Sequence, residues 1–371
     1  MKIGIDAHAA EREGTGNCTY ISNLLLALKE IDDKNEYILY ATDKNHAFYE
    51  NFIGSRNFRI RQLPVRNPIF RIPLFLAWQT YKDSLDILHV QYNAPPIHKG
   101  KLVVTIHDLG FLHLPKTFSR GEALRLKILT KFTANKSDKI ITGSNYSKND
   151  IVNSYGIDEK KIMVIPYGVS QDFDLNKDFQ KTLGVLKKYN IPEKYMLNVG
   201  RLNPRKNFTS LVRAFNRFKK RHPLPHKLVI VGIEDYNTSQ ILRSIQEIDK
   251  GDILFTGFVA KEDLPYIYSQ AEVFIYPSLF EGVGLPLLEA MKSGVPVVTS
   301  NTTSLQEIVK DAAVTLDPLD VEALSQAMWT LMSDNQLREN HIRKGLLRSL
   351  DFSLEMMAHR MVEIYEDLLP I

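Results

Sequence analysis

The stretch SLFEGVGLPLLEAMKSGVPVV, residues 278–298, decides the fold of the second half of the chain. It follows a short apolar run, AEVFIYPS (271–278), and leads into VPVVTS (295–300), and both runs are typical of buried strands. Between them, Pro286 suits the first turn of a helix and Gly294 suits its end. Such a strand–loop–helix–strand unit predicts a parallel sheet whose loops, at the carboxyl ends of the strands, face a ligand crevice.

The same loop combines a backbone suited to an anion with two carboxylates. The amides of Val283, Gly284 and Leu285 at a helix start attract phosphate, yet Glu281 and Glu289 lie on either side of them. Two exposed glutamates without a function are one interpretation, and the acid and base of a glycosidase are another. A ligand that carries both phosphates and hydroxyl groups would satisfy the amides and the carboxylates together.

Length and composition indicate two α/β domains of ordinary size. The chain has 371 residues, of which 44% are hydrophobic and 24% charged. The single cysteine, Cys18, excludes an internal disulfide framework and fits a reducing compartment. The first residues do not resemble a signal peptide, and no stretch reaches the roughly 18 apolar residues of a spanning helix. We therefore expect a cytoplasmic protein that is soluble or sits on a membrane surface.

The positive charge is concentrated in the first half. Residues 1–166 hold 23 basic and 17 acidic residues, whereas the remainder holds 24 basic and 26 acidic residues. Residues 56–82 contain six basic and no acidic residues, interleaved with Phe70, Phe75 and Trp78 among other aromatics. This composition suits contact with an anionic membrane, and a solvated face over core aromatics is the alternative. No nucleic-acid motif accompanies it, so nucleic acid is not an expected partner.

Strands and helices alternate in both halves of the chain. In the first half, strands are predicted at 2–7, 37–42, 87–92, 102–108 and 139–144, and helices at 17–30 and 120–137. In the second half, strands are predicted at 195–200, 227–232, 253–257, 273–278 and 295–300, and helices at 207–221, 238–248, 262–270 and 285–293. This alternation predicts two doubly wound sheets, joined by a polar linker at 164–179. Periodicity does not place a last helix, at about 353–368.

Two loops of the first half can reach a ligand. Gly14 and Gly16 of the GTG segment follow the first strand and open the first helix, where they permit close backbone approach to a phosphate or sugar, or simply make a tight turn. His107, followed by Asp108, ends another strand and is either a group facing the substrate crevice or a satisfied structural imidazole.

A basic loop opens the second half. The segment GRLNPRKN, residues 200–207, follows the first strand there and predicts a helix that starts at Asn207, a good capping residue. Arg201, Arg205 and Lys206 thus gather where a strand ends and a helix begins. Cations beside a helix start suit the binding of a diphosphate, particularly a leaving group on which negative charge develops. A solvated basic turn without a ligand is the alternative.

In combination, these segments resemble a known family. EGVGLPLLE (281–289), joined to VGRLNPRKN (199–207), resembles the retaining nucleotide-sugar transferases of glycosyltransferase family four, which have the GT-B fold. Further matches, in the right order over nearly the whole chain, are GTG (14–16), TIHDLGFLHLPKTFS (105–119), VIPYGV (164–169) and SNTTSLQEIV (300–309). The resemblance implies two Rossmann-like domains that face each other across a cleft. Residues 1–170 would bind the acceptor, residues 171–352 the donor, and the helix of residues 353–371 would cross back to the first domain.

The resemblance also implies roles for the phosphate and sugar groups of the donor. Arg201 and Lys206 would hold the diphosphate, and Glu281 would meet the transferred sugar. The loop at Gly282, Val283, Gly284 and Leu285 would present its amides to sugar and phosphate oxygens.

The remaining implied contacts involve the nucleoside and the acceptor side. Glu289 would accept hydrogen bonds from the ribose hydroxyls, and the nucleobase would lie near Gly257 and Val259. Gly14 and Gly16 would let the first domain approach the donor, and His107 would line the reaction centre. The family usually has arginine at the position of His8 and phenylalanine at that of Val283.

The implied reaction is retaining transfer of a hexose from a nucleotide diphosphate sugar to a glycan or lipid-linked saccharide in surface-polysaccharide synthesis, such as that of lipopolysaccharide. The segment at 105–119 resembles mannosyltransferases, which favours mannose and GDP-mannose over UDP-sugars. No other cofactor and no metal are expected, since the one DxD, Asp172 to Asp174, falls in the predicted linker. A sugar-nucleotide epimerase, a phosphorylase and a non-catalytic sugar-nucleotide-binding subunit are the alternatives.

Overall fold

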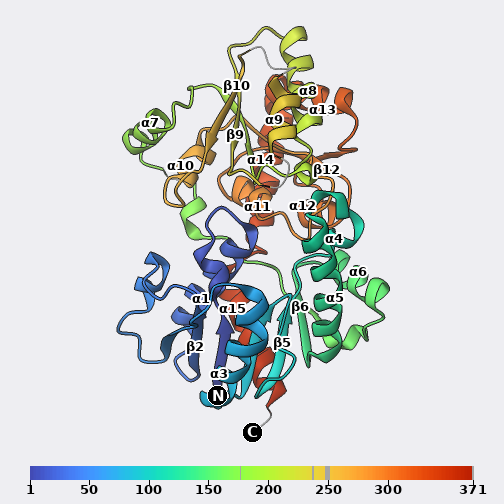
Figure 1. The fold of residues 1–371 in the computed structure, drawn as a ribbon. Coiled ribbons are helices and arrows are strands. Elements are labelled where there is room, and N and C mark those ends of the chain that lie inside the picture. Colours follow the sequence, from blue (N-terminus) through green and yellow to red (C-terminus); the bar gives the residue numbers. More distant parts are fainter. Residues whose placement is uncertain (176, 236–237, 247–250, 370–371) are drawn as a thin grey trace. The chain divides into compact units, whose positions relative to one another are not determined.

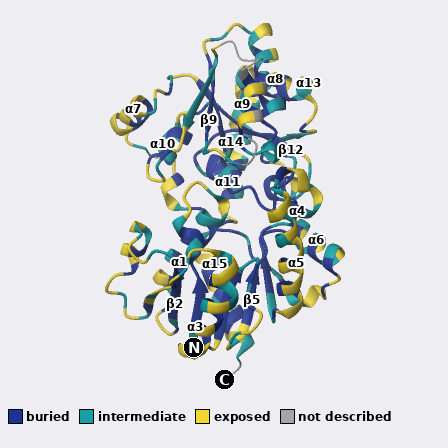
Figure 2. Ribbon diagram, viewed as in Figure 1, coloured by how far each residue is buried: buried dark blue, intermediate teal, exposed yellow. Residues whose placement is uncertain are grey.

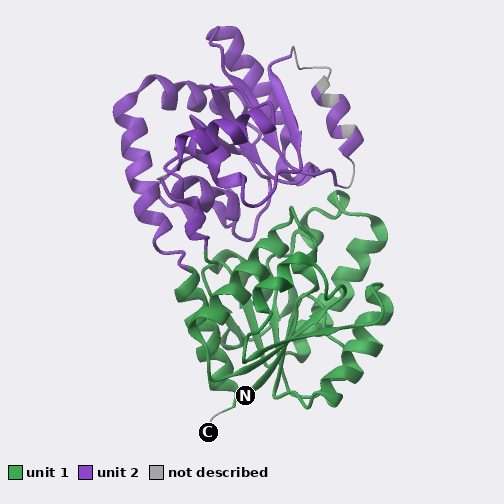
Figure 3. Ribbon diagram, turned by 90° about the vertical axis from the view of Figure 1, so that its left-hand side faces the viewer, with its two compact units in different colours: residues 1–168, 354–371 green, residues 169–353 purple. Residues whose placement is uncertain are grey.

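A computed structural model describes residues 1–175, 177–235, 238–246 and 251–369 of the chain. The chain divides into two compact units (Figure 3). Unit 1 comprises Met1–Gly168 and Leu354–Ile371, and unit 2 comprises Val169–Ser353. The domain boundaries expected from the sequence lie within two residues of this division.

Unit 1 is built on a seven-stranded parallel sheet in the order β3-β2-β1-β4-β5-β6-β7 (Figure 1). Its strands are β1 (Lys2–Asp6), β2 (Glu36–Ala41), β3 (Phe58–Gln62), β4 (Ile87–Gln91), β5 (Lys101–Thr105), β6 (Lys139–Thr142) and β7 (Ile162–Val164). Its helices are α1 (Gly16–Ile31), α2 (Pro68–Phe70), α3 (Ala77–Lys82), α4 (Gly110–His113), α5 (Arg120–Lys136), α6 (Asn145–Tyr155) and α15 (Leu354–Leu368), and a π-helical turn, Arg71–Leu76, joins α2 to α3.

Unit 2 contains a six-stranded parallel sheet in the order β10-β9-β8-β11-β12-β13. The strands are β8 (Tyr195–Val199), β9 (Lys227–Val231), β10 (Ile253–Gly257), β11 (Val273–Tyr276), β12 (Val297–Ser300) and β13 (Val314–Leu316). The helices are α7 (Phe179–Lys188), α8 (Phe208–Arg221), α9 (Thr238–Gln246), α10 (Leu264–Ser269), α11 (Leu285–Lys292), α12 (Leu305–Val309), α13 (Val321–Ser333) and α14 (Asn335–Ser349). The order reverses between β8 and β11, which is where doubly wound sheets bind ligands.

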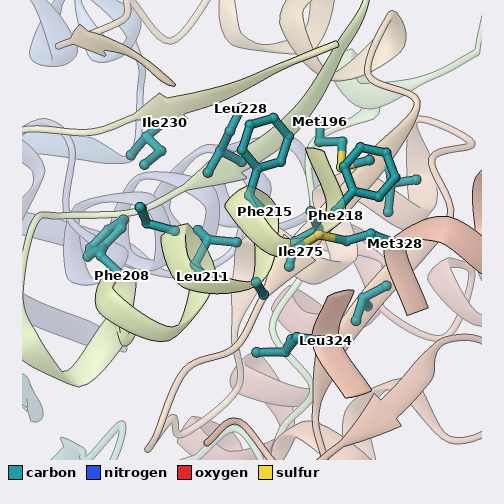
Figure 4. Close-up of a cluster of buried hydrophobic side chains, with 14 of the residues drawn as sticks. Met196, Phe208, Leu211, Phe215, Phe218, Leu228, Ile230, Ile275, Leu324 and Met328 are labelled. Carbon is teal, nitrogen blue, oxygen red and sulfur yellow. The ribbon is translucent and has the colours of Figure 1, made fainter. Parts of the chain in front are cut away.

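Helix α8 shows how the sequence builds the core of unit 2. Phe208, Leu211, Phe215 and Phe218 recur at helical spacing and are all buried, so they form one apolar stripe. Figure 4 shows this stripe together with side chains of β8, β9, β11 and α13. Burial of each such side chain contributes about 1.5–3 kcal/mol to folding.

The two parallel, doubly wound sheets confirm the predicted fold class. Strands β3, β7 and β13 were not predicted, and each of them lies at the edge of its sheet or is only three residues long. Part of the expected linker at 164–179 is structured, because Val164 ends β7 and Phe179 begins α7; its residue 176 lies outside the described residues. None of the described helices has both the length and the apolarity that crossing a bilayer requires.

The basic residues of the run 56–82 do not all share one exposed face, and contact of this run with a membrane stays a prediction. Arg71 is only 1% exposed, and its Nη1 lies 2.9 Å from Asp6 Oδ1. Three further arginines of the run, Arg59, Arg61 and Arg66, pair with the carboxylates of Glu36, Asp83 and Asp43, respectively. Arg59 and Arg61 alternate with Phe58 and Ile60 in FRIRQ, and this alternation belongs to edge strand β3.

Candidate active site

The loop after β11 carries a buried carboxylate, Glu281. It is only 6% exposed, and its Oε1 accepts hydrogen bonds from the hydroxyls of Tyr276, at 3.1 Å, and Ser278. The backbone is held as well, since Ser304 Oγ donates to the Glu281 carbonyl at 2.8 Å and the Glu281 amide donates to Thr303 Oγ1 at 3.3 Å. These contacts fix the carboxylate in one orientation.

Two cations from the loop after β8 reach the same carboxylate, because β8 and β11 are neighbours in the sheet. Lys206 Nζ lies 2.7 Å from Glu281 Oε1, and Arg205 Nη1 lies 3.1 Å from Oε2. Lys206 also donates to the Tyr276 hydroxyl. Burial alone would raise the pKa of Glu281, but the charges of Arg205 and Lys206 outweigh it and lower the pKa to about 2.

Sequence reasoning placed Arg205 in the basic loop but did not assign it to the site, and it missed Tyr276 and Ser278. The segment IYPS that ends β11 contains both hydroxyls just before Glu281, which was the available signal. Arg201, by contrast, pairs with another carboxylate: its Nη2 lies 3.3 Å from Asp235 Oδ1, after β9. The structure therefore brings Lys206 to Glu281, while the ion pair of Arg201 is with Asp235.

The loop at Val283, Gly284 and Leu285, which is expected to bind an anion through its amides, has the backbone shape that this role requires. Gly284 has φ of +81°, and a Cβ on it would lie 2.9 Å from a methyl group of Leu305. Helix α11 begins at Leu285, with Pro286 in its first turn as expected. Within the described residues, the amides of Val283, Gly284 and Leu285 donate to no acceptor, so they can bind an anion.

The second glutamate, Glu289, lies one turn into α11 and is buried. Tyr268 donates a hydrogen bond to its Oε2 at 2.9 Å. Burial raises the pKa of Glu289 to about 7, and the hydrogen bond from Tyr268 and the charge of Lys261 offset only part of this effect. Near neutral pH, Glu281 is therefore ionised whereas Glu289 is partly protonated, although only eight positions separate them in the sequence.

The carboxyl ends of β8, β9 and β10 come close together at glycines. A Cβ on Gly232 would lie 1.9 Å from the Gly200 carbonyl oxygen, so only glycine fits there. The Gly232 amide donates to the Gly257 carbonyl at 3.1 Å, and Gly257 has φ of +71° at the irregular end of β10. Val259 is buried just beyond it. This is the edge where the nucleobase is expected, and that contact remains a prediction.

The expected capping role of the Asn207 side chain is wrong. Asn207 adopts the left-handed conformation, with φ of 58°, and makes no side-chain bond to the first turn of α8. Its Nδ2 instead donates to the Pro318 carbonyl at 2.7 Å. Asparagine tolerates this conformation better than most residues, and here it lets a short 3₁₀ turn, Pro204–Lys206, lead directly into the helix.

His107, in unit 1, is a buried imidazole with a partner on each ring nitrogen. Its Nδ1 lies 2.8 Å from the Tyr167 hydroxyl, and its Nε2 lies 2.8 Å from Gln91 Oε1. Burial lowers the pKa of His107 to about 3, with a further contribution from His89. The ring is therefore neutral at pH 7 and fixed in orientation at the carboxyl end of β5.

The glycine segment of unit 1 opens α1 as predicted. Gly14 has φ of +72°, and Thr15 caps the helix by accepting a hydrogen bond from the Cys18 amide at 3.1 Å. A Cβ on Gly16 would meet no atom within 4 Å, so no neighbour in the structure requires glycine there. The approach of this segment to a donor remains a prediction.

Comparison with known proteins identifies the chain. Residues 18–173 match the model of Glycosyltransferase Family 4, and residues 186–348 match that of glycosyl transferases group 1. O-antigen chain mannosyltransferase B of Escherichia coli is 30% identical over 317 residues, which cover 83% of this chain and 81% of that protein. O-antigen chain mannosyltransferase RfbU of Salmonella typhimurium is 26% identical over 332 residues, which cover 85% of this chain and 87% of that protein.

A solved structure, HepE of Anabaena in complex with UDP-glucose, superposes on 99% of this chain and 100% of its own with a TM-score of 0.76 at 16% identity. This likeness confirms the GT-B fold. The chain belongs to glycosyltransferase family four and is a glycosyltransferase.

Proposed function

We propose that this glycosyltransferase transfers a hexose, most favourably mannose, with retention of configuration from a nucleotide diphosphate sugar to a glycan or lipid-linked saccharide. The observation that carries the proposal is the juxtaposition of Lys206 and Glu281 beside the unbonded amides of the α11 loop. The site offers positive charge and amides to phosphates, and carboxylates to hydroxyls. The similar O-antigen mannosyltransferases support mannose and a role in surface-polysaccharide synthesis. We further propose that the enzyme works at the cytoplasmic face of a membrane, where a lipid-linked acceptor would be met.

In the proposed complex, Lys206 and Arg201 hold the diphosphate, and the amides of Val283 to Leu285 bind phosphate and sugar oxygens. Glu281 accepts hydrogen bonds from hydroxyls of the transferred sugar. Its pKa of about 2 keeps it ionised at working pH and makes it a good acceptor but a weak nucleophile. Its four protein contacts, to Tyr276, Ser278, Arg205 and Lys206, also argue against attack by this carboxylate on the sugar.

The chemical step then needs no protein nucleophile. The bond between the sugar's anomeric carbon and the donor phosphate breaks, and the acceptor oxygen forms a bond to the same face of that carbon. The departing phosphate oxygen takes the acceptor's proton. Lys206 stabilises the charge that develops on this phosphate. We propose that this cation, with Arg201 and the loop amides, replaces the divalent metal that other transferases use to hold a diphosphate.

The test of this assignment is Lys206→Ala. We expect the transfer rate to fall by about 10²–10³, the cost of removing one donor that stabilises a developing oxyanion. Lys220→Ala is the matched control, because Lys220 is an exposed lysine near the end of α8, the helix that follows the turn of Lys206, and it should retain full activity. A Lys206→Ala enzyme within a few-fold of wild type would refute the assignment, provided that its melting temperature is unchanged.

For the donor, we propose GDP-mannose rather than a UDP-sugar. The mannosyltransferase relatives support the sugar, whereas the HepE complex with UDP-glucose shows that this fold also accommodates uridine in another protein. Thermal unfolding with GDP or UDP separates the two. A nucleotide at a hundredfold excess over its Kd stabilises the folded protein by roughly 2.7 kcal/mol, so GDP should raise the melting temperature more than UDP does. A rise with UDP and none with GDP would contradict the proposal.

A further inference from the structure

The carboxyl end of β1 carries a buried ion pair that the proposed chemistry does not use. The central strands of the unit 1 sheet are buried (Figure 2), and Asp6, the last residue of β1, is 3% exposed. Its Oδ1 lies 2.9 Å from Nη1 of Arg71, which is 1% exposed. Because the desolvation of two charges largely cancels their attraction, such a pair adds little net stability. The pair is therefore better explained by what it holds in place.

Asp6 orients the imidazole of His8. Nδ1 of His8 lies 2.8 Å from the same Oδ1 that pairs with Arg71. Burial alone would raise the pKa of Asp6, but the charge of Arg71, with a further contribution from His8, holds this pKa well below its usual range. The carboxylate is therefore ionised and can only accept hydrogen bonds, so Nδ1 of His8 carries the proton of this bond. In neutral His8 the free lone pair then lies on Nε2.

The backbone around His8 is fixed as well. His8 begins a short 3₁₀ turn, His8–Glu11, just after β1. Glu11, at the other end of this turn, accepts hydrogen bonds from the Thr42 amide at 2.7 Å and the Tyr49 hydroxyl at 2.9 Å. Arg71 in turn begins the π-helical turn, and turns of this rare kind occur frequently at functional sites. Both the backbone and the side chain of His8 are thus held in one arrangement.

The second nitrogen of this imidazole is available to a ligand. Of the side chains of Asp6, Arg71 and His8, only that of His8 is partly exposed, at 22%. In the part of the chain that the structure describes, its Nε2 has no hydrogen-bond partner and is not buried. The fold therefore orients a hydrogen-bond acceptor and leaves it open to solvent.

His8 follows a strand at the same edge of the sheet as His107. Strand β4 is the parallel neighbour of both β1 and β5, so the carboxyl ends of the three strands share one edge. Gln91 ends β4, and its Oε1 lies 2.8 Å from Nε2 of His107. Since neighbouring strands are about 4.8 Å apart, the ends of β1 and β5 are about 10 Å apart, a distance that a saccharide spans. His8 is therefore placed to meet a sugar whose reacting end lies near His107.

We propose that Nε2 of His8 accepts a hydrogen bond from a hydroxyl group of the acceptor saccharide, and that Asp6 and Arg71 are positioning residues for this contact. The inference rests on the proposed function, because it concerns the acceptor of the same transfer. The contact selects a group that donates, such as a sugar hydroxyl, over an ionised phosphate or carboxylate, which only accepts. His8 takes no proton from the acceptor, since that proton goes to the departing phosphate.

The first test observes the imidazole itself and requires no transfer. The histidines of the whole chain are labelled with nitrogen-15 for magnetic resonance, and His8→Phe identifies the signals of His8. At about pH 8, Nε2 should resonate as an unprotonated nitrogen and Nδ1 as a protonated one. Methyl α-glycosides of mannose, glucose, galactose and N-acetylglucosamine are then added one by one, and at least one should shift the Nε2 signal. His226 of unit 2, whose Nε2 lies 2.8 Å from Glu272 Oε1, should show no shift and is the internal control.

The glycoside that shifts the signal then serves as the acceptor in transfer assays. His8→Phe keeps a ring but removes the accepting nitrogen, so its KM for the glycoside should rise roughly five- to tenfold, the worth of one hydrogen bond, while its KM for the donor stays unchanged. His8→Gln has an amide oxygen that accepts and should recover most of the loss, whereas His8→Arg only donates and should not. The matched control is His359→Phe, at an exposed histidine of α15, which should behave like wild type.

Deoxyfluoro analogues of that glycoside identify the hydroxyl group, because fluorine does not donate a hydrogen bond. With the wild-type enzyme, the analogue that lacks this hydroxyl should show the same rise in KM as His8→Phe shows with the parent glycoside. With His8→Phe, the same analogue should cause no further rise. Because each comparison of analogue with parent is made within one protein, it remains informative even if the substitution lowers stability.

Three results would overturn the inference: a protonated Nε2 in the free protein, no glycoside that shifts its signal, or an analogue that raises KM equally in wild type and His8→Phe. The failure of the proposed function looks different. A glycoside that shifts the Nε2 signal of an enzyme without transfer activity contradicts only the proposed function, whereas normal transfer with an unchanged KM in His8→Phe contradicts only the role of His8.

Discussion

At the scale of single residues, Glu281 and Glu289 show how environment separates two like side chains. Both are buried, but Glu281 meets two cations and two hydroxyls, whereas Glu289 meets one phenol. The pKa is accordingly lowered to about 2 for Glu281 and raised to about 7 for Glu289. If Glu289 accepts hydrogen bonds from the ribose hydroxyls, its ionised form is the stronger acceptor, so nucleotide binding becomes sensitive to pH.

The first prediction follows from that shift. The affinity for GDP should rise as the pH increases from about 6 to about 8, because an unliganded Glu289 with a pKa of about 7 loses its proton over this range. Calorimetric titrations at several pH values measure the effect. Glu289→Gln should bind more weakly and with little dependence on pH, and a wild-type protein with constant affinity, or a glutamine variant with the same slope, would exclude the ribose role.

What the sequence reveals about the site depends on how local each contact is. Three features could be predicted from residues that are close in sequence: the turn at Gly284, the start of α11 and the position of Lys206 near a strand end. The structure contains all three. The pairing of Arg205 with Glu281 joins residues 76 positions apart. No spacing rule indicates which cation of a basic loop meets which acid, because tertiary packing decides it.

At the scale of elements, α15 is the last helix of the chain but a core element of unit 1. It packs against α1, and the Tyr365 hydroxyl lies 2.6 Å from His89 Nδ1 on β4. Met361 is fully buried in this contact layer. We expect Met361→Ala to lower the unfolding free energy of unit 1 by about 2–5 kcal/mol, the range for truncating a buried methionine.

Denaturant unfolding followed by Trp78 fluorescence in a Trp329→Phe background measures this change in unit 1. Glu363→Ala, at an exposed position of the same helix, should change the midpoint little. An equally small change for Met361→Ala would mean that α15 contributes little to the stability of unit 1.

Elements with strong periodicity were predictable and short or edge elements were not. Buried parallel strands such as β11, VFIY, are continuous apolar runs, which the sequence displays plainly. Helix α13 also carries a usable signal, since Leu324, Met328 and Leu331 recur at helical spacing, yet it was not predicted. Strand β13 has three residues that are only partly buried, so neither length nor pattern distinguishes it from a loop.

At the scale of the whole molecule, the two units differ in the groups whose proton binding between pH 5 and 7 changes when the chain unfolds. Burial lowers the pKa of three histidines in unit 1, namely His89 and His107, each to about 3, and His98. Among the described residues of unit 2, one histidine, His341, has a lowered pKa. The raised pKa of Glu289 in the same unit has the opposite effect on how stability changes with pH. The net effect of acid on stability should therefore differ between the units.

The signs follow from proton binding in the folded and unfolded states. Below about pH 6.5, His89 and His107 bind protons in the unfolded state but stay neutral in the folded state. Unit 1 therefore loses stability as the pH falls from about 6.5 toward 3. Folded Glu289 binds its proton at about pH 7 but the unfolded residue only near 4.5, so unit 2 gains from this group as the pH falls from 7 to 4.5. The stabilising ionisation of Glu281 is lost only below about 4.5.

We therefore expect acidification from pH 7 to pH 5 to lower the melting temperature of unit 1 more than that of unit 2. Single-tryptophan variants report the units separately: Trp329→Phe leaves Trp78 in unit 1, and Trp78→Phe leaves Trp329 in unit 2. Replacing His89 by glutamine should flatten the dependence of unit 1 on pH even if it lowers the melting temperature throughout. Melting temperatures that fall in parallel for both reporters would show that the buried histidines do not govern the response of unit 1 to acid.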